Sequence, residues 1–166
     1  MKANRLIQLS LLMKIHPLWV AWMLGAVGLC AAADWPQWRG PLRSGHSAEA
    51  GLPVTWGGAD KENVLWKVPS DFGHSSPIVW GERLFLSASV RKLPKVSDQT
   101  AENQQHRVAC FRTTDGAKLW QTDIDPGSWD TMFSFTTPTP ITDGKRLFAF
   151  FGSATLAALD LDGKLI

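Results

Sequence analysis

Tyrosine is absent from this chain of 166 residues, whereas tryptophan occurs nine times. A buried tryptophan fills a large volume but must place its indole N–H on a hydrogen-bond acceptor. Tryptophans that recur in similar local settings therefore indicate a repeated structural role. Hydrophobic residues make up 45% of the chain and charged residues 19%, which predicts an ordinary globular protein with a packed core.

Cysteine is scarce, because the chain contains only Cys30 and Cys110. We expect Cys30 to be removed with an N-terminal signal, which would leave a single thiol and no internal disulfide. Cys110 lies in the apolar run 108–111. We therefore expect a buried and inert thiol rather than a nucleophile.

Several signatures of binding chemistry are also absent. No set of Cys and His has the spacing of a zinc site, and no glycine-rich phosphate loop is present. The formal net charge of +2 arises in residues 1–33, where Lys2, Arg5 and Lys14 stand without any acidic residue. The remainder is close to neutral, so no basic face for nucleic acid is predicted. No helical apolar period with caps occurs after residue 33, and we therefore predict an all-β chain.

Residues 1–33 have the order of a signal peptide. Basic residues come first, an apolar run follows over 18–29, and small residues at 31–33 fit cleavage before Asp34. The apolar stretch 18–33 is shorter than the roughly 20 residues that span a bilayer. We therefore predict an exported protein, periplasmic or secreted. An uncleaved leader or a lipid on Cys30 would instead hold the protein at a membrane, and a start at Met13 would give a more compact leader.

Residues 34–62 are rich in Gly and Pro and have no sustained period, which predicts an irregular segment. Trp35, Trp38 and Trp56 would anchor this segment across the body that follows. Arg39 beside Trp38 has two interpretations, a ligand clamp or packing with a local salt bridge, and we favour the second.

His74, Ser75 and Ser76 form a polar cluster with both a chemical and a structural interpretation. The three side chains could supply a base and a nucleophile. Neighbours in sequence rarely align for proton transfer, however, because such sites are defined by geometry rather than adjacency. We predict a loop in which the serines bind backbone groups.

Asp123, Asp125 and Asp130 resemble the start of a calcium loop. The sixth position of such a loop needs Gly and the twelfth needs Glu. Those positions hold Ser128 and Ser134 in this chain. We therefore predict no metal site here, and we assign no catalytic or cofactor-binding residue anywhere in the sequence.

The C-terminal part of the chain predicts two consecutive hairpins. Asp143-Gly144 and Asp162-Gly163 lie between apolar runs. This pattern is typical of type I′ turns, in which both central residues need a positive φ. The flanking strands would cover 140–142, 146–151 and 156–161.

This C-terminal part repeats residues 76–120 in altered form. Ser76-Pro77-Ile78 corresponds to Thr139-Pro140-Ile141, and Arg83-Leu84-Phe85 to Arg146-Leu147-Phe148, each 63 positions later. Asp115-Gly116 corresponds to Asp162-Gly163, 47 positions later. The two offsets, 63 and 47, differ by 16 because the first copy contains a polar insertion at 90–107. We expect this insertion to be an exposed loop. Without the insertion the repeat has 47 residues and four short strands, close to the ~40–50 residues of a β-propeller blade.

Tryptophan marks the end of each predicted repeat. Trp120 closes one copy, its counterpart in the next would be residue 167, and Trp66 takes the same place in a preceding unit. We expect both rings to fill the gap between neighbouring sheets while each N–H meets a backbone carbonyl. The predicted organisation is a blade end at 63–68, a blade at 76–120 and a truncated blade at 139–166. Together they form a partial β-propeller of about three four-stranded antiparallel blades within 63–166.

These motifs resemble a known family. Val108-Ala109-Cys110-Phe111, followed by Thr-Asp-Gly and Lys-Leu-Trp, is similar to the repeat of quinoprotein-like (PQQ-type) β-propellers. Residues 156–164 match that repeat better, because Asp160 stands where the earlier copy has Arg112. The runs 35–41 and 73–77 look like exported PQQ-like repeat proteins of the planctomycete type. The resemblance covers residues 34–166 and implies a β-propeller fold.

The resemblance implies two classes of function. Dehydrogenases of this fold hold PQQ with calcium, use acidic catalytic residues and in many cases carry adjacent cysteines, which this chain lacks. Other members are scaffolds, such as the propeller lipoprotein of the outer-membrane protein assembly machinery, and bind proteins through sheet edges and loops. We predict a non-catalytic protein-binding or scaffold module without a cofactor. The alternative is a fragment of a PQQ-dependent quinoprotein dehydrogenase whose catalytic blades are absent.

An incomplete ring has a further consequence. Propellers close with about four to eight blades, so residues 63–166 would leave open sheet edges that invite pairing. We therefore expect one of two situations. Either the reading frame is truncated, in which case its product could be non-functional and aggregate, or further chains assemble with this one to close a ring.

Overall fold

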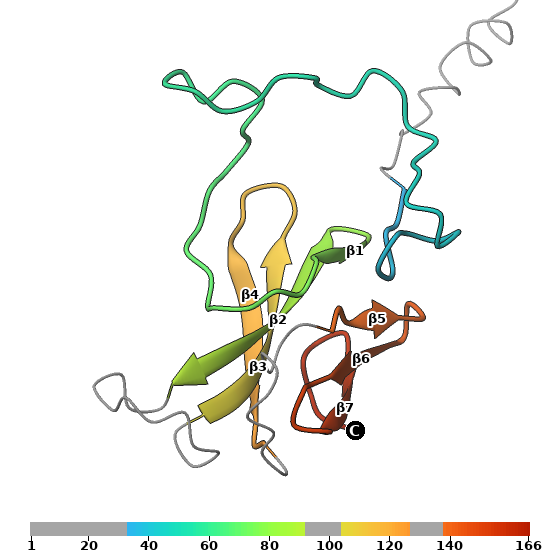
Figure 1. The fold of residues 1–166 in the computed structure, drawn as a ribbon, viewed down its shortest axis with the longest axis vertical. Helices are drawn as coiled ribbons and strands as arrows, with labels where there is room; N and C mark the ends of the chain where they lie inside the picture. Colours follow the sequence, from blue (N-terminus) through green and yellow to red (C-terminus); the bar gives the residue numbers. More distant parts are fainter. Residues whose placement is uncertain (1–32, 92–103, 127–137) are drawn as a thin grey trace, which may run out of the picture. The chain divides into compact units, whose positions relative to one another are not determined.

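The computed structural model describes residues 33–91, 104–126 and 138–166 (Figure 1). The predicted signal peptide at 1–33, apart from its last residue, lies outside the described residues. Every regular element in the described part is a β-strand, which confirms the prediction of an all-β chain. Among these residues there is no helix of the length and apolarity needed to cross a membrane.

Within the described residues, seven strands form two antiparallel sheets. The first sheet contains, in order, β1 (Ile78–Trp80), β2 (Arg83–Arg91), β3 (Gln104–Arg112) and β4 (Lys118–Ile124). The second contains β5 (Ile141–Thr142), β6 (Arg146–Phe150) and β7 (Leu156–Asp160), again in chain order. Successive side chains of a strand point to opposite faces. Burial accordingly alternates along β6, where Leu147 and Ala149 are buried between exposed or half-buried neighbours.

The first two strands pair in the same register in each of the two sheets. Ile78 pairs with Phe85 in the first sheet and Ile141 with Phe148 in the second, so both partners are displaced by 63 positions. The adjacent pairs, Val79 with Leu84 and Thr142 with Leu147, show the same displacement. The sequence repeat is therefore also a repeat of backbone pairing.

The residues that follow β7 add one bridge to the second sheet. Leu165 forms a bridge with Leu159, and the backbone N–H of Ile166 donates to Ala158 O at 3.0 Å. In the first copy, Lys118 at the start of β4 pairs with Phe111 at the corresponding place. In the described residues the expected four strands are present in the first copy, and the second copy has three strands and this bridge.

The Asp-Gly turns differ from the prediction. Gly144 and Gly163 have positive φ values of 83° and 86°, but neither Asp143 nor Asp162 does, so these are not type I′ turns. A carboxylate takes over the stabilising role, because Asp143 and Asp160 each accept two backbone N–H groups of their turn through Oδ1. The donors are Lys145 and Arg146 for Asp143, at 2.8 and 2.6 Å, and Asp162 and Lys164 for Asp160, at 3.0 and 2.9 Å. Aspartate stabilises turns in this way without a second left-handed residue.

Two other sequence predictions require correction. Residues 63–68 were expected to form a strand but do not: Glu62 makes one bridge with Gly57, and Leu65 is 88% exposed. A strand needs a partner for its backbone groups, and no described segment pairs with 63–68. The ends of the predicted loop 90–107 also belong to strands, because β2 continues to Arg91 and β3 begins at Gln104. The middle of that loop, 92–103, lies outside the described residues.

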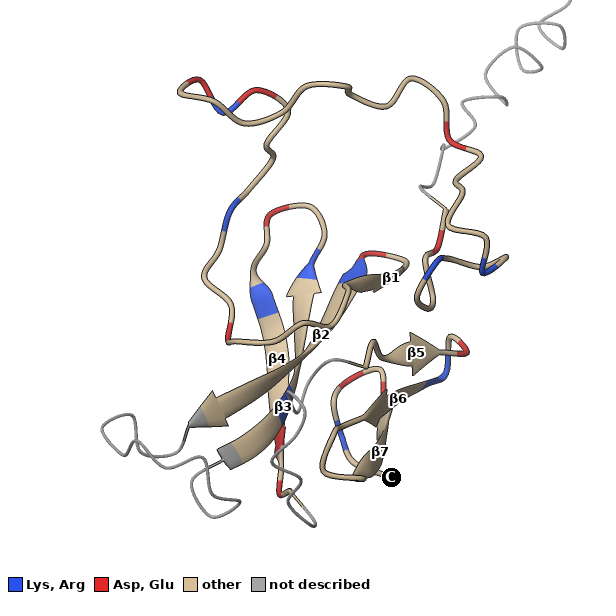
Figure 2. Ribbon diagram, in the orientation of Figure 1, with Lys and Arg blue, Asp and Glu red and all other residues tan. Residues whose placement is uncertain are grey.

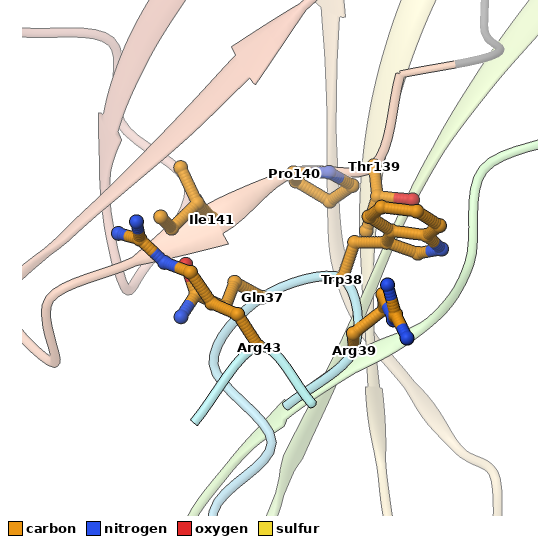
Figure 3. Close-up of a pocket in the computed structure, with 7 residues that line it drawn as sticks. All are labelled: Gln37, Trp38, Arg39, Arg43, Thr139, Pro140 and Ile141. Carbon is orange, nitrogen blue, oxygen red and sulfur yellow. The ribbon is translucent and has the colours of Figure 1, made fainter. Parts of the chain in front are cut away.

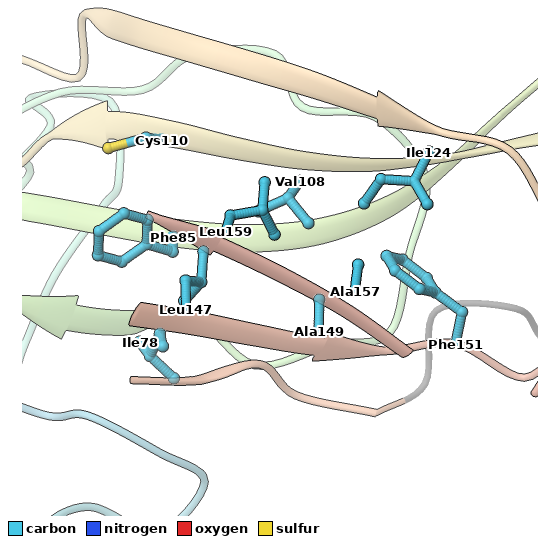
Figure 4. Packing of buried hydrophobic residues seen from close by; sticks show 10 residues of the cluster. All are labelled: Ile78, Phe85, Val108, Cys110, Ile124, Leu147, Ala149, Phe151, Ala157 and Leu159. Atoms are coloured by element: carbon cyan, nitrogen blue, oxygen red, sulfur yellow. The ribbon is translucent and has the colours of Figure 1, made fainter. Parts of the chain in front are cut away.

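The core is one cluster of buried apolar side chains drawn from both sheets (Figure 4). The first sheet contributes Ile78, Phe85, Val108, Cys110 and Ile124, and the second and its turn contribute Leu147, Ala149, Phe151, Ala157 and Leu159. Burial of such side chains contributes roughly 1.5–3 kcal/mol each, which stabilises the association of the two sheets. Cys110 has no exposed surface and is a free thiol, as predicted.

Candidate functional site

The junction between the two sheets is centred on Trp120 of β4. Its indole Nε1–H donates to Leu161 O at 3.0 Å, in the turn that follows β7. A Cβ placed on Gly163 in that turn would lie 2.6 Å from the Trp120 ring. Glycine is therefore required by the close approach of the ring as well as by its φ of 86°.

The same contact occurs one unit earlier in the chain. The Nε1–H of Trp66 donates to Thr113 O at 2.7 Å, and a Cβ on Gly116 would lie 2.6 Å from the Trp66 ring. Thr113 and Gly116 belong to the turn between β3 and β4, the counterpart of the turn after β7. The predicted bond from each indole N–H to a backbone carbonyl is confirmed. The predicted place between two sheets is confirmed for Trp120 but not for Trp66, whose own segment belongs to neither of the described sheets.

Two more side chains of the first sheet bind the turn after β7. Arg83 forms an ion pair with Asp162 at 3.0 Å and donates to Leu161 O, and the Thr122 hydroxyl donates to Gly163 O. The Asp162 side chain is 82% exposed, so the ion pair itself contributes little. The hydrogen bonds to turn carbonyls fix the position of the turn.

A third tryptophan covers a glycine at the same end of the second sheet, where Arg146 at the start of β6 pairs with Asp160 at the end of β7. A Cβ on Gly144, in the turn between β5 and β6, would lie 2.2 Å from the ring of Trp80 at the end of β1. The first sheet therefore contacts both Asp-Gly turns of the second copy.

The N-terminal segment joins the edge strands of the two sheets. Trp35 exchanges two backbone hydrogen bonds with Val79 of β1, at 2.8 and 2.9 Å, and Pro36 O accepts the N–H of Thr142 in β5 at 2.9 Å. Val79 and Thr142 are equivalent residues of the two copies, 63 positions apart. The segment is attached to the body at Trp35, as expected, through backbone hydrogen bonds. The other two predicted anchors, Trp38 and Trp56, are 63% and 74% exposed.

The polar cluster at 74–76 is structural. Ser75 Oγ donates to Ser87 O at 2.9 Å, and the backbone N–H of Ser76 donates to Thr139 Oγ1 at 3.0 Å. The exposed His74 makes an edge contact with Phe72, with ring centroids 5.2 Å apart. The Ser75 side chain thus binds the backbone, as predicted. Among the described residues, His74 forms no hydrogen bond with Ser75 or Ser76.

His106 is a buried polar residue that sequence reasoning missed. It has no exposed surface, its Nε2 lies 2.5 Å from Ser153 Oγ, and its ring stacks on Phe151 with centroids 4.2 Å apart. Burial lowers the pKa of His106 to about 4, so the ring is neutral at pH 7. A signal was available, because His106, Val108 and Cys110 follow the two-residue period of a buried strand face.

Asp123, from the predicted calcium pattern, binds an arginine. Its two carboxylate oxygens accept Arg107 Nε and Nη2 at 2.6 and 2.9 Å, and Arg107 Nη1 also donates to Asp71 at 3.0 Å. These two carboxylates hold the pKa of Arg107 above its usual value. The network ties β3, β4 and residue 71 together, while Asp130 lies outside the described residues.

A pocket of about 360 Å³ lies between the N-terminal loop and the beginning of β5 (Figure 3). It is lined by Gln37, Trp38, Arg39, Arg43, Thr139, Pro140 and Ile141. The Arg39 guanidinium lies 5.5 Å from the centre of the Trp38 ring, and its Nη2 donates to Ser44 O at 3.3 Å. A local salt bridge was predicted for Arg39, and this prediction is wrong: among the described residues Arg39 forms no ion pair. Its partners are an aromatic ring and a carbonyl. Arg43 and Thr139 were not identified from the sequence.

No protein-family model matches the sequence, and no curated protein matches it either.

Proposed function

We propose that this chain is an exported PQQ-like β-propeller repeat protein that acts as a non-catalytic protein-binding or scaffold module. The observation that carries the proposal is the contact of Trp120 with the turn at Gly163, which Trp66 repeats at Gly116. Units that pack on their neighbours through equivalent contacts are what a radially repeated architecture requires. The shared strand register of the two copies supports the same interpretation.

The polar groups with potential for acid–base chemistry support a structural assignment. His106 is buried and neutral, Ser75 binds the backbone of β2, and Asp123 is bound by Arg107. A general base needs access to substrate and a pKa near the working pH. His106 meets neither requirement, and Ser75 and Asp123 are already engaged in the hydrogen bonds given above.

The dehydrogenase alternative requires a site for PQQ and calcium. Calcium needs several carboxylate or carbonyl oxygens around one point, and the part of the chain that is described holds no group of three His, Cys, Asp or Glu residues that could gather around an ion. The thiol of Cys110 is enclosed in the core. We therefore derive no reaction step through PQQ.

Protein binding would use the outer edge of the first sheet. β4 lies at the end of the strand order and pairs only with β3 among the described strands. An edge strand presents backbone donors and acceptors to which an extended segment of another protein can add. Figure 2 shows Lys and Arg interspersed with Asp and Glu along the described chain, a pattern that favours a protein partner over nucleic acid.

One experiment separates the two functional classes. Purified protein would be mixed with PQQ and CaCl₂, desalted, and assayed for quinone absorbance and for dye reduction with alcohols and sugars. The scaffold proposal predicts no retained quinone and no turnover. A retained quinone spectrum with substrate-dependent dye reduction would overturn it in favour of an oxidoreductase.

The binding edge can be tested by site-specific photo-cross-linking in cell-envelope extracts. A cross-linker at the exposed Gln121 of β4 should give a discrete product, and one at the exposed Lys145 in the turn between β5 and β6 should not. Equal products at both positions would contradict the assignment of β4 as the binding edge.

A further inference from the structure

The second sheet has an apolar face that points away from the first sheet, which we call the outer face. Ile141, Phe148 and Ala158 lie side by side on it, since each is directly opposite the next in neighbouring strands. Phe150 and Leu156 form the adjacent pair and are 48% and 67% exposed. The residues that alternate with them in β6 and β7 are the ones that enter the core. A contiguous exposed apolar surface of this kind marks an interaction site.

The equivalent face of the first sheet is covered. Strand pairing defines the equivalent residues, because the pair Phe148–Ala158 in the second sheet corresponds to the pair Phe85–Cys110 in the first. The five equivalents of the outer face are Ile78, Phe85, Ser87, Val108 and Cys110. Each is at most 2% exposed, and four of them belong to the core that the first sheet shares with the second. The outer face of the second sheet therefore has the residue pattern of a surface that another sheet covers.

The surface that does the covering also occurs twice in this chain. In the second sheet it consists of core residues, namely Leu147, Ala149, Ala157 and Leu159. The pairing register gives their equivalents in the first sheet as Leu84, Leu86, Ala109 and Phe111. Ala109 and Phe111 are 6% and 7% exposed, whereas Leu84 and Leu86 are half-buried and form the accessible part. One chain thus carries both halves of the contact, so the outer face of one copy matches the first sheet of another.

Trp66 marks where such a sheet would lie on the first sheet. Trp120 contacts Gly163 of the second copy, and it belongs to the sheet that packs on that copy. Trp66 makes the same contact with Gly116 of the first copy, but its segment belongs to neither described sheet. Leu65 beside it is 88% exposed. The sheet that would accompany Trp66 is thus the one element that this chain does not supply among its described residues.

We propose that the outer face binds a second copy of this chain, packing on Leu84 and Leu86 of its first sheet beside its Trp66. The contact repeats between chains the packing that joins the two sheets within one chain. Its two halves are different surfaces, so copies associate head to tail and add further copies until the ends meet. The contact does not use the β4 edge. A failure of this proposal would therefore leave the cross-linking experiment at Gln121 to decide the protein-binding function.

The first test is the mass of the purified full chain by light scattering, measured between about 1 and 100 μM. We expect the mass to rise above that of one copy as the concentration increases. Leu156→Glu buries a charge in the apolar contact and should weaken association about tenfold or more. Its urea midpoint should be unchanged, because Leu156 is exposed in the single chain. Val54→Glu, at a site that is 89% exposed outside the outer face, should associate as the original chain does. A monomer at every concentration, or equal association of the two variants, would overturn the proposal.

The second test maps the surface that the outer face contacts. A diazirine cross-linking residue in place of Leu156 is irradiated in an equal mixture of unlabelled and nitrogen-15-labelled protein, so that links between copies carry both labels. Trypsin releases Leu84 and Leu86 in one peptide, 84–91, and most of the outer face in another, 147–164. We expect links between copies that join the cross-linker to 84–91. Links between copies to 147–164 would mean that two outer faces pair with each other. That result, or links within single copies alone, would contradict the head-to-tail contact.

Discussion

The backbone N–H of Ser76 donates to the hydroxyl oxygen of Thr139 at 3.0 Å, although the two residues are 63 positions apart. They are also equivalent members of the repeat, since each precedes the proline that leads into the first strand of its sheet. Because these equivalent residues are in contact, the two copies of the repeat lie side by side. Ser76 and Thr139 each lie at the same end of their own sheet. This contact and the junction at Trp120 together define how one copy follows the other.

Gly163→Ala should destabilise the protein far more than an alanine at a glycine of similar backbone conformation. Both Gly163 and Gly57 have φ near 90°, but only Gly163 has an aromatic ring where the new methyl would lie. We expect about 1 kcal/mol for the unfavourable φ in either variant, and a further ~1–3 kcal/mol of overpacking for Gly163→Ala alone. Urea unfolding monitored by tryptophan fluorescence measures the difference, and equal losses in the two variants would contradict the ring contact.

Trp120→Phe should separate the hydrogen bond of the indole from the packing of its ring. The variant keeps an aromatic ring over Gly163 but loses the donor to Leu161 O, for an expected loss of about 1 kcal/mol. Trp120→Ala loses the ring as well and should cost roughly 3 kcal/mol. Trp56→Ala is the control, because an exposed ring should contribute within about 0.5 kcal/mol. A loss for Trp120→Ala no larger than that of the control would show that this ring does not join the sheets.

The free energy of unfolding should decrease as the pH is lowered, because protonation of His106 is unfavourable in the folded protein. Its pKa in the folded protein is about 4, below the ordinary value of 6.5, so the unfolded chain binds the extra proton between these two values. Stability is therefore full above pH 6.5 and decreases by roughly 1 kcal/mol per pH unit as the pH falls toward 4. Unfolding free energies at pH 7, 6 and 5 test this, and His106→Gln should remove most of the slope. If the unfolding free energy of the variant depends on pH as strongly as that of the original protein, the pH dependence arises from other groups.

Cys110 should be unreactive in the folded protein. Burial raises the pKa of its thiol to about 11, and the side chain has no exposed surface. A thiol reagent at pH 8 should therefore modify Cys110 only when urea unfolds the chain. Rapid modification without urea would contradict the described core.

Arg107→Lys should cost more than Arg112→Lys. Arg107 is 15% exposed and binds two aspartates, one of them with two parallel hydrogen bonds, whereas Arg112 is 44% exposed and binds Asp115 alone. Lysine cannot reproduce the paired geometry, so we expect a loss of about 1–2 kcal/mol for Arg107→Lys and under ~0.5 kcal/mol for Arg112→Lys. Thermal unfolding of both variants provides the comparison, and a reversed order would be inconsistent with the Arg107 network.

The strands that carry the repeat were predictable from sequence because local and long-range signals agree there. The Asp-Gly turn, the apolar runs beside it and the 63-position correspondence all mark the same hairpin at 141–148, and the structure pairs Ile141 with Phe148. The role of Trp66 and Trp120 was predictable for a related reason. A buried indole must place its N–H on an acceptor, and both Trp66 and Trp120 follow Leu in a short apolar run.

Other features depend on contacts that the local sequence does not contain. The stretch before Val108 is polar and looks like a loop, yet His106 is buried because Ser153 and Phe151 surround it from a part of the chain about fifty positions away. The segment 63–68 has the composition of a strand, but composition cannot supply a pairing partner. The pocket at Trp38 brings together a loop and the start of β5, and nothing in either stretch alone indicates the other.

The central claim is that the tryptophan at the end of one unit packs on the turn glycine of the next, and NMR on the full chain tests it most directly. A ring 2.6 Å from the place of a Cβ on Gly163 must shift the Hα resonances of that glycine upfield and give nuclear Overhauser effects between them and the Trp120 ring protons. We expect the same pair of signals for Gly116 with Trp66. Glycine Hα shifts at unfolded-chain values, without Overhauser effects to either indole, would contradict the account.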